Sequence, residues 1–216
     1  MTEHNFDHMR RGMVASQLRT TGVNDPRVLA AMGAVPRELF VPKAMIPVAY
    51  ADAQVPLGGG RDLNSPMALG KLLTEAHPQE GDRALVIGAA TGYAAAVLAQ
   101  LVGFVVAVEA DGTLLSAARE ALAGSGVVLV ESPLAEGYAE GAPYDLILID
   151  GAVEQVPEAL VDQLADRGRL ATGLLENGVS RLALGRKSGG AFGLLPFADV
   201  AATILPGFER PRVFSF

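Results

Sequence analysis

The chain has 216 residues, enough for one domain with a small appendage, and half of them are hydrophobic, so a sizeable core can be buried. Only 19% of the residues are charged, which argues against long disordered segments, and the absence of cysteine excludes disulfides and any cysteine-based metal site or nucleophile. The formal net charge of −7 opposes non-specific binding to nucleic acid, so no nucleic-acid partner is expected.

The first part of the chain is predicted to be helical. Residues 7–20 carry Met, Val and Leu at helical spacing, and Gly22 ends that pattern. Asp25 followed by Pro26 is typical of an N-cap and the first helical residue, so a second helix is expected from there to about residue 35.

Prolines and glycines divide the next stretch. Residues 58–60 are three consecutive glycines and predict a flexible spot, and Pro66 is expected to open a third helix that runs through Leu73, because proline fits the first helical turn. Turns are predicted before these, at Pro36, Pro42 and Pro47.

From Asp82 onward, short apolar runs alternate with helical patterns. The expected strands are 83–87, 104–108, 127–130, 145–150 and 168–175, and the helices between them are 93–102, 113–123 and 157–165. Strands that alternate with helices indicate an α/β fold with a doubly wound, mostly parallel, Rossmann-like sheet. The runs 180–187 and 191–197 predict an antiparallel hairpin at one edge, and residues 212–216 fit a short final strand. We therefore expect an N-terminal helical and substrate-loop region (1–80) and a core (81–216) within one compact domain.

One segment is long enough to span a membrane, because no residue from Ala84 to Val108 is charged. Its glycines, Gly88, Gly92 and Gly103, favour a strand, turn, helix and second strand instead. The polar residues 1–11 also lack the apolar core of a signal peptide. We expect no membrane association and a cytoplasmic location, with which the lack of cysteine is compatible.

The glycine turn that follows the first predicted strand of the core is a candidate cofactor site. Gly88 and Gly92 bracket this turn, where a ligand can approach the backbone at the carboxyl end of a parallel strand. Glu109 ends the next strand, 21 residues after Gly88, a spacing at which an acid can accept hydrogen bonds from ribose hydroxyls. The pair favours an adenosine-containing cofactor; the alternative is a tight structural turn with Glu109 solvated.

Three further residues belong to this candidate site. Ala90 stands in the turn where a middle glycine would be useful, and Thr91 either lines the site or caps the helix that follows. Asp150 ends the fourth strand, where it either contacts cofactor or substrate or is a solvated strand end. No metal site is expected, because His4 and His8, although spaced i, i+4, lack acidic or cysteine partners nearby.

The N-terminal third resembles the protein-L-isoaspartate O-methyltransferase family. The resemblance rests on five stretches, namely 13–19 (MVASQLR), 27–32 (RVLAAM), 35–42 (VPRELFVP), 49–52 (AYAD) and 56–58 (PLG). It continues through residues 81–83 and 142–145 to about residue 175 and is loose beyond that. It implies a Rossmann-like methyltransferase that uses S-adenosylmethionine to methylate the α-carboxylate of isoaspartyl residues in damaged proteins, so that they can be repaired. A carboxylate is ionised near neutral pH and needs no general base, so the catalytic parts are expected to be hydrogen-bond donors that aim it.

Several positions depart from the family pattern. Where the family has Thr-Ile-Ser-x-Pro against the substrate, this chain has Asp62-Leu63-Asn64-Ser65-Pro66. Asn64 therefore takes the serine position, and we predict Asn64 and Ser65 as the catalytic donors, although Ser65 also fits the start of a helix. Asp62 adds negative charge that Arg61 can offset. On the cofactor side, an acid, a glycine and an aspartate of the family are replaced by Val86, Ala90 and Pro133.

These departures leave three hypotheses open. The first is an isoaspartyl methyltransferase with a modified site. The second is a non-catalytic relative that keeps the fold, and the third is a methyltransferase for another acceptor, suggested by the altered loop at residues 62–64.

Overall fold

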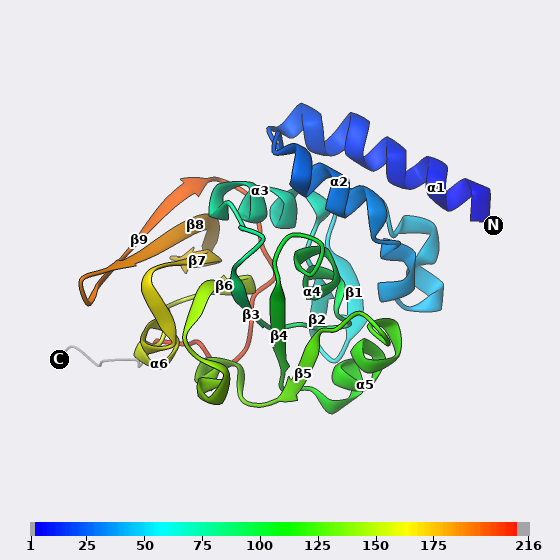
Figure 1. Ribbon diagram of the computed structural model, residues 1–216. Coiled ribbons are helices and arrows are strands. Elements are labelled where there is room, and N and C mark those ends of the chain that lie inside the picture. Colours follow the sequence, from blue (N-terminus) through cyan, green and yellow to red (C-terminus); the bar gives the residue numbers. More distant parts are fainter. Residues whose placement is uncertain (1–2, 211–216) are drawn as a thin grey trace.

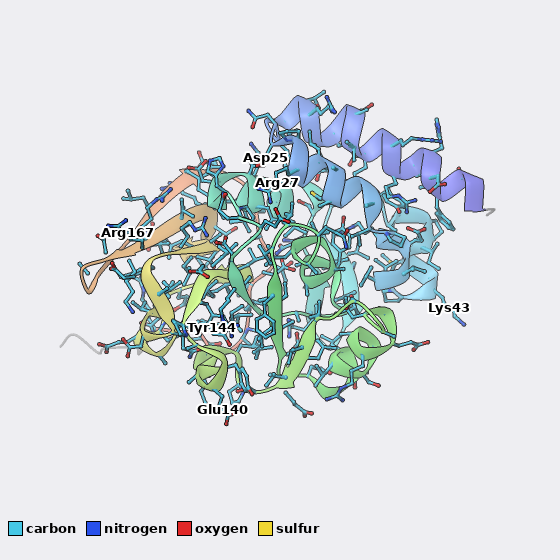
Figure 2. All side chains as sticks on the ribbon, viewed as in Figure 1. Asp25, Arg27, Lys43, Glu140, Tyr144 and Arg167 are labelled. Atoms are coloured by element: carbon cyan, nitrogen blue, oxygen red, sulfur yellow. The ribbon has the colours of Figure 1, made fainter. Side chains whose placement is uncertain are left out.

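The computed structural model describes residues 3–210, so the short strand predicted at 212–216 lies outside the described residues. The chain begins with α1 (Glu3–Gly12), which continues through a π-helical turn over Met13–Leu18 and a 3-10 turn that stops at Gly22. In α2 (Pro26–Ala34) the side chain of Asp25 accepts hydrogen bonds from the amides of Arg27 and Val28, which confirms the predicted N-cap. Asp25 and Arg27 are both labelled at the start of α2 in Figure 2.

The segment between α2 and the core contains a hairpin that the sequence analysis did not predict. After 3-10 turns at Arg37–Phe40 and Lys43–Val48, β1 (Val55–Gly58) pairs with β2 (Arg61–Leu63), and the predicted flexible glycines form the turn between them. Pro66 then opens α3 (Pro66–Ala76), as predicted. The hairpin was missed because β1 contains Pro56, and proline within a short apolar run argues against a strand.

The core is a seven-stranded sheet, and it confirms the predicted fold class. The strand order is β5-β4-β3-β6-β7-β8-β9, parallel from β5 to β7 and antiparallel beyond. The strands are β3 (Arg83–Ile87), β4 (Phe104–Glu109), β5 (Val128–Glu131), β6 (Tyr144–Val153), β7 (Leu164–Glu176), β8 (Val179–Ser188) and β9 (Ala191–Ala198), and the helices are α4 (Tyr93–Leu98), α5 (Gly112–Ala121) and α6 (Glu158–Asp162). The hairpin of β8 and β9 extends to one side of the molecule (Figure 1).

Some element boundaries differ from the predictions. Strand β6 continues past Asp150 to Val153, because Ala152 and Val153 pair with β7. Strand β7 begins at Leu164, which pairs with Tyr144, and this pairing ends α6 at Asp162. Helix α4 ends at Leu98 because the residues after it form tight turns with i to i+3 hydrogen bonds.

Each face of the sheet is covered by its own core. On one face, Val86, Ala107 and Leu148 pack with the N-terminal helices, α3 and α4. On the other face, Leu85, Val106 and Ile147 pack with residues around α6 and with Leu205 and Phe208 from the C-terminal segment. Strands buried on both faces read as continuous apolar runs, which is why the sequence predicts β3 and β4 well. Within residues 3–210 no helix is both long and apolar enough to cross a membrane.

Candidate functional site

The strand order reverses between β3 and β6, and the predicted site residues meet at that point. Strand β3 lies between β4 and β6, so their carboxyl ends bring Gly88, Glu109 and Asp150 to one edge. Open α/β sheets bind ligands in the crevice at such a reversal. The fold therefore places the predicted cofactor residues where a ligand site is expected.

The turn after β3 keeps its backbone close to β4. Gly88 and Gly92 have φ angles of +74° and +100°, which glycine adopts without strain. The amides of Gly88 and Ala89 both donate to the carbonyl of Val108 at 3.0 Å. Ala90 is also left-handed, with φ of +51°, and its amide donates to Glu109 Oε2 at 2.7 Å.

Glu109 is fully buried and saturated with hydrogen bonds. Its Oε1 accepts from the amides of Ala110 and Asp111 at 2.9 and 3.0 Å, and Oε2 accepts from Ala90. Arg61 completes the set with a two-pronged ion pair, Nη1 to Oε1 at 2.7 Å and Nη2 to Oε2 at 3.0 Å. A carboxylate offers about four lone-pair positions, so these five donors leave no free acceptor. Glu109 is thus not the solvated strand end of the alternative interpretation.

The space above Gly88 is filled by the C-terminal segment. A Cβ built on Gly88 would stand 2.8 Å from Leu205 Cδ1 and 3.5 Å from Arg61 Nη2. A Cβ on Gly151 would stand 2.5 Å from Leu205 Cγ. Leu205 is itself buried. Its segment follows β9 in the chain and is drawn in red in Figure 1, where it runs past the strands of the sheet.

Asn64 joins the segment before α3 to the sheet and to the C-terminal segment. Its Nδ2 donates to Asp150 Oδ1 at 2.7 Å, and its Oδ1 accepts from the amide of Thr203 at 2.8 Å. Asp150 is buried rather than solvated, and burial raises its pKa against the opposing effects of Asn64, Arg37 and Arg61. Both polar ends of the Asn64 side chain are therefore engaged within the protein.

A buried arginine and tyrosine lie beside this pair. Arg37 donates from Nε to the carbonyl of Ala49 at 2.8 Å and from Nη2 to the carbonyl of Asn64 at 2.6 Å. Its guanidinium carbon lies 4.6 Å from the centre of the Tyr93 ring. Burial lowers the pKa of Arg37 and raises the pKa of Tyr93. Perturbed ionisable groups of this kind cluster at functional sites.

The hydroxyls of the two remaining predicted residues both hydrogen-bond to the backbone. Ser65 caps α3, since its Oγ accepts from the amide of Ala68 at 3.2 Å. The Thr91 hydroxyl donates to the carbonyl of Phe40 at 2.6 Å, so the idea that Thr91 caps α4 was wrong; Gly92 holds that position. Thr91 instead joins the glycine turn to the N-terminal region.

The sequence did not predict the parts that Arg61 and the C-terminal residues Thr203 and Leu205 play at the site. It named Arg61 only as a charge that offsets Asp62, although an acid at the end of a buried strand requires a partner, and a nearby arginine was a signal. Nothing in the sequence marked Leu205 and Thr203 as site residues, because one apolar and one small polar residue beyond the last strand form no recognisable motif. Within residues 3–210 no group of three or more His, Asp or Glu side chains is placed to hold a metal ion.

In this conformation the protein's own side chains occupy the groups that S-adenosylmethionine would use. The acid that would accept the ribose hydroxyls is saturated by Arg61 and backbone amides. The place where a nucleoside would approach the backbone of Gly88 is taken by Leu205. A nucleoside could enter only after both side chains withdraw.

Comparisons with known proteins agree on one family. Residues 9–195 match the family model described as protein-L-isoaspartate(D-aspartate) O-methyltransferase. A protein-L-isoaspartate O-methyltransferase of Methanoregula boonei is 43% identical over 164 residues, covering 74% of this chain and 76% of that protein. One of Halorhodospira halophila is 39% identical over 189 residues, covering 84% of each.

Solved structures show the same likeness in three dimensions. A protein-L-isoaspartate O-methyltransferase superposes with a TM-score of 0.81 at 25% identity, covering 92% of this chain and 66% of that one. A Plasmodium falciparum structure described as the same enzyme, in complex with S-adenosyl-L-homocysteine, gives 0.78 at 19% identity, over 90% of this chain and 96% of that one. The second likeness supports the fold alone.

Proposed function

Because the chain belongs to the protein-L-isoaspartate(D-aspartate) O-methyltransferase family, we propose that it methylates the α-carboxylate of isoaspartyl residues in damaged proteins, with S-adenosylmethionine as methyl donor. The observation that carries the proposal is the position of Glu109. It ends β4 at the reversal of the sheet, and its carboxylate faces the glycine turn, 2.7 Å from the amide of Ala90. An acid there is placed to bind the ribose of a nucleoside cofactor once Arg61 is displaced.

The roles of the individual residues are part of the proposal. The cofactor side is assigned to the glycine turn and two acids, namely Gly88, Ala90, Thr91, Gly92, Glu109 and Asp150. The acceptor side is assigned to Asn64 and Ser65 as donors to the isoaspartyl carboxylate. Asn64 Nδ2 donates one hydrogen to Asp150 while its Oδ1 accepts from Thr203, so the isoaspartyl carboxylate is assigned the second hydrogen of Nδ2.

The partners and location follow from the same proposal. Isoaspartyl peptides or proteins are the expected partners, with no nucleic acid, which the acidic balance of the chain supports. The cytoplasm is the proposed location, with which the absence of cysteine is compatible.

Two measurements test the function in sequence. Titration with S-adenosylhomocysteine in a calorimeter tests the cofactor site, and methyl transfer from labelled S-adenosylmethionine to an isoaspartyl peptide tests the reaction. We expect both binding and transfer, with transfer lost in Glu109→Ala and absent for the same peptide with a normal aspartyl linkage. No heat at millimolar ligand would exclude the proposal.

One observation favours a second candidate, a non-catalytic relative that keeps the fold. Arg61 pairs with Glu109 and Leu205 fills the space above Gly88, so the chain's own contacts satisfy the groups that a ligand would use. This candidate predicts no turnover at saturating cofactor. Transfer to the isoaspartyl peptide that depends on Glu109 would rule it out.

A further inference from the structure

Two side chains from distant parts of the sequence close the cofactor crevice. Arg61 comes from β2 and pairs with Glu109, and Leu205 comes from the C-terminal segment and covers Gly88. Asn64, three residues after Arg61, accepts a hydrogen bond from the amide of Thr203, two residues before Leu205. The two closing side chains are therefore connected, so that withdrawal of one disturbs the other.

We propose that Arg61 and Leu205 are closing contacts that keep the cofactor site of the free protein shut, and that a nucleoside competes with them for Glu109 and for the space above Gly88. The inference rests on the proposed function, since it concerns the same site. It adds that the unliganded chain is autoinhibited and that cofactor binding is coupled to opening.

The competition is set by the chemistry of Glu109. Its three backbone donors stay in place when Arg61 leaves, so the carboxylate remains anchored and regains the accepting capacity that the guanidinium had taken. A guanidinium gripping both oxygens is a strong, charge-assisted partner, which ribose hydroxyls replace at a cost. The apparent affinity for cofactor is therefore lowered by the fraction of molecules that are open.

The closing elements are attached in a way that permits withdrawal. Arg61 stands at the end of a two-stranded hairpin whose turn contains three glycines. The C-terminal segment is joined to β6 by a single bridge, with hydrogen bonds of 2.6 and 3.0 Å between Ala152 and residues 203 and 205. Ile204, between the two, is 60% exposed. Segments with few such bonds open at low free-energy cost.

The test compares binding of S-adenosylhomocysteine by calorimetry in the full-length protein and its variants. Arg61→Gln removes the charge but keeps a polar side chain, and Leu205→Ala clears the space above Gly88. We expect each variant to bind about tenfold more tightly than the original chain, because the closed state is weakened. Arg186→Gln and Leu195→Ala are matched controls on exposed residues of β8 and β9 and are expected to bind as the original chain does.

The outcomes separate this inference from the proposed function. If the original chain binds S-adenosylhomocysteine and both variants bind it equally well or more weakly, the closing contacts are ruled out. The proposed function stands in that case. Binding that is about tenfold tighter in each variant than in the original chain supports the closing contacts. No binding by any protein defeats the proposed function, and the inference with it.

A second measurement covers the case in which a variant does not fold. Amide hydrogen exchange of the original chain is followed at Thr203 and Leu205, whose amides are bonded to Asn64 and Ala152. Saturating S-adenosylhomocysteine should speed exchange at both amides, because the segment is displaced. Unchanged exchange at saturation would contradict the inference.

Discussion

At the scale of single residues, the site combines buried charges whose partners come from far along the chain. Glu109 and Arg61 satisfy each other. Among residues 3–210, only the side-chain amide of Asn64 lies within hydrogen-bond distance of Asp150, and the charges of Arg37 and Arg61 act on it from farther away. A buried carboxyl with so few partners is costly to ionise. Asp150 is therefore the residue at which the structure makes stability depend on pH.

The pH dependence has a definite sign. Burial raises the pKa of Asp150 in the folded protein above the usual value for an aspartate, so between the unfolded and folded pKa values the folded state binds more protons. The contribution of Asp150 to the free energy of unfolding is therefore present at low pH and is lost as the pH rises from the unfolded-state pKa through the folded-state pKa. Asp150→Asn, which can still accept from Asn64, should be more stable than the original chain at neutral pH and should show less loss above about pH 4.

Urea unfolding at a series of pH values measures this effect. Glu120→Gln, an exposed substitution on α5, controls for the loss of one negative charge. If Asp150→Asn has a lower free energy of unfolding than the original chain at pH 7, the folded protein stabilises the ionised form of Asp150, contrary to this prediction.

At the scale of elements, a helix cap fixes the point at which the chain leaves the site. Ser65 caps α3 through the amide of Ala68, and α3 carries the chain away from Asn64. Ser65→Ala should lower the free energy of unfolding by about 1 kcal/mol, as for other helix caps, and Ser65→Asn should restore most of it. Both are measured by urea unfolding.

The same variants examine the proposed catalytic role of Ser65. If its hydroxyl aims the acceptor carboxylate, both variants lose isoaspartyl methyl transfer, although Ser65→Asn keeps the cap. Unchanged transfer in both would leave Ser65 with a structural role only.

Helices and strands that are marked by a local sequence pattern could be predicted from the sequence. Asp25 with Pro26 located the start of α2, Pro66 located the start of α3, and the apolar run 83–87 matched β3 to the residue. The β1–β2 hairpin was not predictable, since its stability comes from packing rather than from its four- and three-residue strands. Arg61 and Glu109 were both visible as charges, but 48 residues separate them, and only the fold shows that they pair.

At the scale of the whole molecule, Arg37 connects parts that the sequence keeps apart. It holds the carbonyls of Ala49 and Asn64 and covers the ring of Tyr93, which begins α4. The N-terminal region and the sheet thereby share one core around the buried guanidinium of Arg37. Nothing in the run Val35–Pro42 indicated that its arginine would be inside.

Removal of Arg37 should loosen that connection. Arg37→Met keeps the apolar stem but leaves two buried carbonyls without donors, so we expect a loss of about 2–4 kcal/mol in the free energy of unfolding. For a chain of this size the melting temperature should fall by roughly 5–15 °C, measured by calorimetry. Lys43→Met, at the exposed position labelled in Figure 2, is the control and should melt within about 2 °C of the original chain.

The hydrogen bond between Asn64 and Thr203 spans 139 positions, which has a consequence for biosynthesis. A ribosome delivers the glycine turn, Glu109 and Asp150 well before residues 202–205 emerge, and domains begin to fold as they emerge. During that interval Leu205 does not yet cover Gly88, and Arg61 alone closes the crevice. A nucleoside present at translation therefore competes with one closing contact instead of two until residues 202–205 have emerged.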